Sequence, residues 1–212
     1  GCARLTSLLL PAKLTSIGNN AFRDCSRLTG LTLPGKLTTI GKEGFRGCSG
    51  LTSLSIPDSV TTIADHAFAE CAGLTQVRLS NIVTSIGSFA FSGCRQLKEL
   101  TIPEKVTSFG QGAFASCESL ERVTIPAGLN HAISTSHTSV EGATLSQFFG
   151  CSGLRSVTIK VPSVSTNYTD WINNESLKTT GITEIIFSEG VTNIGDATFS
   201  DCKSLKSLTF PA

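Results

Sequence analysis

The stretch LTSLSIPDSVTTIADHAFAEC, residues 51–71, contains the pattern that decides the fold. Leu54 and Ile56 alternate with serines, and a period of two is typical of a half-buried strand. Pro57 ends this strand, because proline has no N–H for the next rung of a sheet. A second, β-branched stretch follows at residues 60–63. It predicts another short extended segment on the opposite side of the same unit.

The same pattern recurs along the whole chain. The cysteines lie at Cys2, Cys25, Cys48, Cys71, Cys94, Cys117, Cys151 and Cys202, so the first five intervals are 23 residues each and the last two are longer. A phenylalanine three residues before and a leucine three residues after accompany seven of these cysteines. Apolar residues about three apart predict one helical or 3₁₀ turn with its apolar side facing inward.

A unit of this length cannot bury its own apolar residues, so stacked units bury them against each other in one continuous core. We therefore predict an α/β repeat solenoid with a parallel β-sheet face, short second extended segments and short helical or 3₁₀ turns. Residues 1–212 are expected to form one solenoid, with regular units at 1–126, irregular units at 127–181 and a regular end at 182–212. Because neither end shows a polar capping unit, we expect a fragment of a longer chain.

These motifs resemble the BspA-like leucine-rich repeat (LRR_5), which is marked by L-x-x-I-x-I-P, V-x-x-I-G and A-F-x-x-C. They appear in residues 51–71, and the resemblance covers 1–126, 148–159 and 182–212. It implies a leucine-rich repeat fold in a secreted or surface-attached protein of bacteria or certain protozoa, often an adhesin or host-interaction protein. It implies no catalytic residue. No ligand carries over, since members of the family bind different partners.

Composition and motifs exclude several classes of protein. With a net charge of +1 the chain lacks the basic surface of a nucleic-acid binder. No apolar run approaches the roughly 18 residues of a membrane span, so we expect no membrane insertion. No phosphate, zinc or hydrolase motif occurs, and we predict no enzyme, no cofactor and no metal. His131 and His137 with Glu141 match no metal or catalytic spacing, and a solvated loop is the favoured interpretation.

The cysteines are predicted to be free thiols. Equivalent side chains on stacked strands are about 4.8 Å apart and parallel, whereas a disulfide needs converging Cβ atoms about 3.8 Å apart. Each cysteine also lies between a core phenylalanine and a core leucine, which suits a small buried apolar residue. Cys2 could instead be the lipid-modified residue of a lipoprotein. Its place one period before Cys25 favours the repeat.

The irregular segments hold one candidate contact. Tyr168 and Trp171 are the chain's only tyrosine and tryptophan, and aromatic residues are enriched at binding hot spots. For Trp171 the favoured interpretation is that it fills the place of the core phenylalanine that its unit lacks. Asn167 and Asn174 begin N-x-S/T patterns, but in a chain so rich in serine and threonine they are weak evidence for glycosylation.

The outward strand positions form two columns in which small hydroxyl residues dominate. Charged and amide side chains gather at Gln76, Arg78, Glu99 and Arg122. These four residues are the candidate binding residues of the sheet face, because solenoids bind extended partners on such surfaces. A solvated face whose charges pair across the strands is the plainer alternative.

Two functions follow. The first is a non-catalytic protein–protein interaction module of an extracellular or cell-surface protein, with adhesion or host-protein binding as its role and an extracellular-matrix or surface protein as its partner. The second is a structural spacer that displays another domain of the parent chain, since nearly identical units offer a partner little information. Exposed end repeats also make end-to-end self-association plausible.

Overall fold

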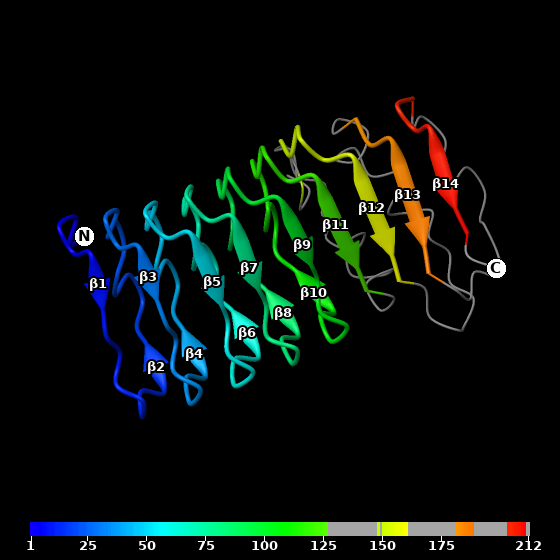
Figure 1. Cartoon of the computed structure of the whole chain (residues 1–212). Coiled ribbons are helices and arrows are strands. Elements are labelled where there is room, and N and C mark those ends of the chain that lie inside the picture. Colours follow the sequence, from blue (N-terminus) through cyan, green and yellow to red (C-terminus); the bar gives the residue numbers. More distant parts are fainter. Residues whose placement is uncertain (127–147, 149, 161–180, 189–202, 211–212) are drawn as a thin grey trace, which may run out of the picture.

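The computed structural model describes residues 1–126, 148, 150–160, 181–188 and 203–210. In these residues the chain winds as a stack of coils, with one strand of each coil beside its counterpart in the next (Figure 1). Every strand pairing is parallel. The predicted solenoid with a parallel sheet face is therefore confirmed. The predicted boundaries of the irregular units fall largely outside the described residues and stay a prediction.

Among the described residues, nine strands form the main face: β1 (Ser7–Leu8), β3 (Gly30–Leu31), β5 (Ser53–Ser55), β7 (Gln76–Arg78), β9 (Glu99–Thr101), β11 (Arg122–Ile125), β12 (Ser156–Ile159), β13 (Glu184–Phe187) and β14 (Ser207–Thr209). They pair as β1–β3, as β5–β7 and as the five-stranded sheet β9–β11–β12–β13–β14. Equivalent residues of successive coils are in register, as Glu99, Arg122 and Ser156 show. The 23-residue period therefore predicts which side chains lie side by side.

The predicted second extended segments are also present. They are β2 (Ser16–Ile17), β4 (Thr39–Ile40), β6 (Thr62–Ile63), β8 (Ser85–Ile86) and β10 (Ser108–Phe109). β2 pairs with β4, and β6, β8 and β10 form a three-stranded sheet. The isoleucines of these strands are buried and the preceding hydroxyl residues are mostly exposed. Each of the first five coils thus has two short strands facing one shared core.

The predicted helical or 3₁₀ turn is not confirmed, because the described residues contain no helix. In this part of each coil, successive N–H groups alternate between two kinds of acceptor. Arg46 donates to Glu43 in its own coil, at 3.2 Å, whereas Phe45 and Gly47 donate to carbonyls of the next coil, each at 2.8 Å. Positive φ angles of 56° at Glu43 and 72° at Gly47 accompany this alternation. The turn is therefore held mainly by its neighbour, and the α/β description reduces to strands and turns.

Stacked phenylalanines run through the centre of the core. Phe22, Phe45, Phe68, Phe91, Phe114 and Phe148 stack in order, with ring centroids 5.1 to 5.6 Å apart. All except Phe22 are buried, and Phe22 is half-buried. This spacing is within the 4.5–7 Å range of favourable aromatic pairs.

All seven described cysteines are free thiols, as predicted. Five of them donate a hydrogen bond to a phenylalanine carbonyl of the preceding coil; for example, Cys71 Sγ lies 3.2 Å from the Phe45 carbonyl oxygen. Burial raises the pKa of the Cys48 and Cys94 thiols to about 12. The thiols therefore stay protonated and link adjacent coils, a role that spacing alone did not predict.

Candidate interaction site on the sheet face

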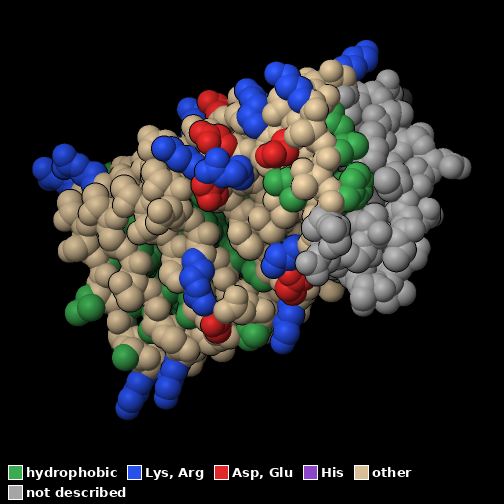
Figure 2. Space-filling view, turned by 45° about the vertical axis from the view of Figure 1, so that its right-hand side comes forward, with side chains coloured by type: hydrophobic (Ala, Val, Ile, Leu, Met, Phe, Trp, Pro, Cys, Tyr) green, Lys and Arg blue, Asp and Glu red, His purple; other side chains and the backbone are tan. Residues whose placement is uncertain are grey.

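The four sheet-face residues predicted from sequence lie on three successive coils. Gln76 and Arg78 are on β7, Glu99 is on β9 and Arg122 is on β11, and all four are exposed. They alternate with inward residues, so the strand pleat places them on the solvent side. The structure therefore brings the predicted residues together on one face. Figure 2 shows acidic and basic side chains lying close together on part of the visible face.

Part of this charge is neutralised locally. The Arg122 guanidinium pairs with the Glu99 carboxylate, as expected for opposite charges on adjacent strands, and this hydrogen bond raises the pKa of Arg122. Arg78 Nη2 lies 3.4 Å from Asp58 Oδ2 in the preceding coil. The Asn81 backbone N–H donates to Asp58 Oδ1 at 2.9 Å. That backbone hydrogen bond, together with Arg78, lowers the pKa of Asp58, so its carboxylate stays ionised.

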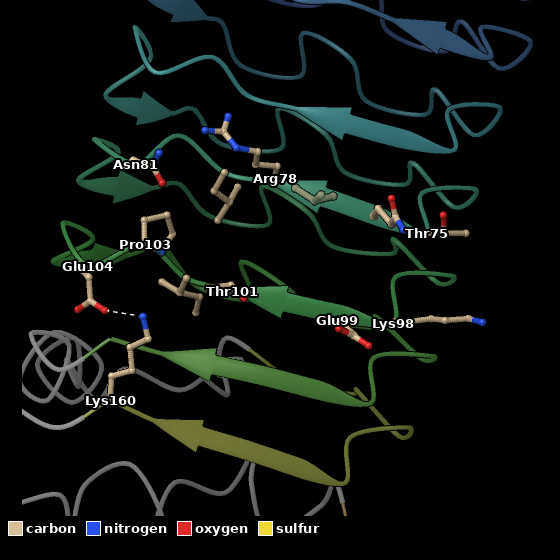
Figure 3. A pocket seen from close by; sticks show the side chains of 13 residues that line it. Thr75, Arg78, Asn81, Lys98, Glu99, Thr101, Pro103, Glu104 and Lys160 are labelled. Carbon is tan, nitrogen blue, oxygen red and sulfur yellow. Dashed lines mark hydrogen bonds and ion pairs between the residues drawn. The ribbon is translucent and has the colours of Figure 1, made fainter. Parts of the chain in front are cut away.

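A groove of about 880 Å³ lies on this face between β7 and β9. One wall is residues 75–79 with Asn81, the other is residues 98–104 without Leu100, and Lys160 completes the lining at one end. Figure 3 shows these side chains along the two strands, with Lys160 joined to Glu104. Gln76, Arg78 and Glu99 line the groove, whereas Arg122 lies beside it. Three of the four predicted residues thus share one concavity.

Sequence reasoning missed Lys98, Glu104 and Lys160. Lys98 occupies a column that holds threonine in the four preceding coils, and this change of residue type was a signal that could have revealed it. Lys160 Nζ lies 2.9 Å from Glu104 Oε1, although the two residues are 56 positions apart. No periodic signal predicts that contact, because it joins coils separated by an irregular unit.

The other candidates lie outside the described residues. They are Tyr168, Trp171, Asn167, Asn174, His131, His137 and Glu141, together with Cys202. Within the part that is described, no group of three or more histidine, cysteine, aspartate or glutamate side chains is arranged to hold a metal ion. Nor does that part contain a helix of the length and apolarity needed to cross a membrane. The role of the irregular segments stays a prediction.

The coils repeat every 23 residues and align their strands in a parallel sheet face, as in leucine-rich repeat proteins. The model of the BspA type leucine-rich repeat region matches residues 1–121, 38–159 and 131–212. The chain belongs to this family, as its motifs predicted. A comparison with curated proteins found no match.

Solved structures of similar fold come from several bacteria. A leucine-rich repeat protein of Bacteroides ovatus is 25% identical, with a TM-score of 0.54; the match covers 100% of this chain and 62% of that one. A leucine-rich repeat protein of T. pallidum is 23% identical over 94% of this chain and 78% of that one, with a TM-score of 0.63. A leucine-rich cell surface protein of Faecalibacterium prausnitzii is 23% identical over 94% and 70%, with a TM-score of 0.54. The chain spans less than two thirds of the Bacteroides protein.

Proposed function

We propose that the chain is a non-catalytic protein–protein interaction module of a secreted or cell-surface protein, with adhesion or host-protein binding as its role. The observation that carries the proposal is the groove between β7 and β9, which is lined by three of the four candidate residues and by side chains from successive coils. Family membership supports it, and so does the similar fold of a protein described as a cell surface protein. The partner is a protein, with extracellular-matrix and surface proteins of a host as the first candidates.

The test is biolayer interferometry of the purified chain against extracellular-matrix proteins, mucins and glycans. The sheet-face variant carries Arg78→Ser, Glu99→Ser and Arg122→Ser. The control carries Lys36→Ser, Lys105→Ser and Glu118→Ser, which change the net charge equally but lie outside the strands. Saturable binding that the control keeps and the sheet-face variant loses would support the proposal.

A further variant, with residues 127–150 and 160–181 trimmed to the repeat length, tests Tyr168 and Trp171. Binding lost only in that variant would assign the contact to the irregular segments rather than to the groove. The spacer function is favoured by the uniform core of the regular coils, where phenylalanine and cysteine columns repeat with the same contacts. Absence of saturable binding to every panel member would favour the spacer.

End-to-end self-association stays part of the proposal. Leu208 and Phe210, on and just after β14, are 39% and 41% exposed, and Leu9 after β1 is 95% exposed. Light scattering across a concentration series would show a mass above that of one chain if these residues meet in solution.

A further inference from the structure

The main sheet is interrupted at the position of the groove. β5 pairs with β7, and β9 pairs with β11, but β7 and β9 belong to separate hydrogen-bonded sheets although they are neighbours in the stack. Val77, the inward residue of β7, is only half-buried and lines the groove, whereas Leu54 and Leu100 at the same position of the adjacent coils are 3% and 2% exposed. The interruption therefore opens a path from the surface to a core side chain.

A second interruption shows what else the groove requires. β3 and β5 also lie in separate sheets, and Leu31 of β3 is likewise half-buried. The outward residues there include Gly30 and Ser53, which are too small to build walls. Between β7 and β9 the outward residues include the long side chains of Gln76, Arg78 and Glu99, which form a polar rim around an apolar floor. An apolar pocket with a polar rim is the arrangement in which anchoring side chains of a partner bind.

The groove runs along the strands rather than across them. Its walls extend over residues 75–79 and 98–104, which are the full lengths of β7 and β9 with their flanking residues (Figure 3). At about 3.3 Å per residue, five extended residues span about 17 Å. The lining therefore fits a short extended segment that follows one coil, and it does not require contacts over many coils.

The charges of the rim favour one kind of partner. Arg78, Glu99, Glu104 and Lys160 each form an ion pair. Lys98, at the end of the groove where β9 begins, forms no ion pair with any described residue. Its ammonium is thus the charge that a partner can neutralise without breaking an existing pair, and the complementary group is a carboxylate.

We infer that the groove between β7 and β9 binds an extended peptide segment of a partner protein that directs one apolar side chain toward Val77 and places a carboxylate beside Lys98. This inference rests on the proposed interaction function and specifies the partner's chemistry. A segment of this kind gains burial from its anchor side chain and specificity from its acidic residue.

The probe is a library of random linear heptapeptides displayed on phage and selected on the immobilised full chain. The enriched sequence is then synthesised with a fluorophore and measured by anisotropy. Thr101→Phe places a ring in the groove from an exposed position of β9, and Thr32→Phe, in the same column three coils earlier, is its control. Lys98→Gln removes the unpaired charge, with Lys36→Gln as its control.

The expected enriched peptides combine one large apolar residue with a nearby aspartate or glutamate. Thr101→Phe should weaken their binding more than tenfold and Thr32→Phe less than twofold. Lys98→Gln should weaken it about threefold to fivefold and reduce its dependence on salt, as for one exposed charge pair. No enrichment, enrichment without an acidic residue, or binding indifferent to Thr101→Phe would each overturn the inference. If panel proteins then still bind and lose binding in the sheet-face variant, the proposed function stands while this inference fails.

Discussion

Replacing Phe68 by alanine should reveal how much the phenylalanine stack contributes to stability. Phe68 is fully buried, and its ring stacks on Phe45 at 5.5 Å and on Phe91 at 5.4 Å. Truncating a buried phenylalanine typically costs 3–5 kcal/mol in transfer free energy and cavity formation. Each lost aromatic pair is worth roughly 0.5–1.5 kcal/mol. Two stacked partners therefore place Phe68→Ala at the upper end of the range, about 4–5 kcal/mol.

Phe22 provides the matched comparison within the same column. It is half-buried and stacks on one described ring only, that of Phe45 at 5.1 Å. With less burial and one stacked partner, Phe22→Ala should cost about half as much, roughly 2 kcal/mol. Phe68→Leu keeps most of the volume and loses only the ring contacts, so its cost should be about 1–2 kcal/mol.

The measurement is urea unfolding at fixed temperature, followed by far-ultraviolet circular dichroism. Since stacked repeats can unfold in parts, amide hydrogen exchange should confirm that the affected coils are those containing residues 45, 68 and 91. Equal costs for Phe22→Ala and Phe68→Ala would refute the stacking argument. So would a leucine variant as unstable as the alanine variant.

Three further predictions concern thiols, turns and surface charge. Burial raises the pKa of Cys94 to about 12, so the neutral thiol's contribution to stability is complete below the ordinary thiol pKa near 9 and decreases as pH rises toward 12. The urea midpoint should therefore fall between pH 9 and pH 12. Iodoacetamide should label the native thiol slowly at pH 8.5. Gly112→Ala should lower the free energy of unfolding by more than 1 kcal/mol, because Gly112 has φ of 58° and an added Cβ would meet the Phe89 ring at 2.6 Å. Glu99→Gln should leave the midpoint unchanged, since its pair with Arg122 is exposed.

The strands and the core were predictable from periodicity. A 23-residue period places equivalent residues of successive coils side by side, so one unit predicts the inward and outward positions of the others. The prediction of free thiols relied on the same geometry, since parallel neighbours do not converge. The repeat geometry could not reveal that the Cys71 thiol donates to the Phe45 carbonyl, because a hydrogen bond between coils depends on side-chain rotamers that spacing does not determine.

The predicted helical or 3₁₀ turns were not confirmed, for an identifiable reason. Apolar residues about three apart fit a 3₁₀ turn, and they equally fit the observed turn, which also closes every second amide on the carbonyl three residues earlier. The sequence did contain a signal that separates the two. Gly47, Gly93 and Gly150 each precede a cysteine by one, and all three have φ of 72–75°. Glycine before every second cysteine indicates left-handed backbone, which a continuous helical turn would not need, and Asp24, Glu70 and Ser116 adopt it in the intervening units.

The candidate site lies where the chain departs from its own repeat. Val77 stands where the three preceding coils have leucine, and Lys98 stands in a column that begins with four threonines. Ser80 replaces the proline of the preceding units, and it is buried with its hydroxyl accepting the Ile82 N–H. All three belong to the coils on either side of the interruption between β7 and β9. Val77 and Lys98 both line the groove, whereas Arg122 does not. Departure from the period therefore identifies two groove-lining residues that the search for charge in the outward columns did not select.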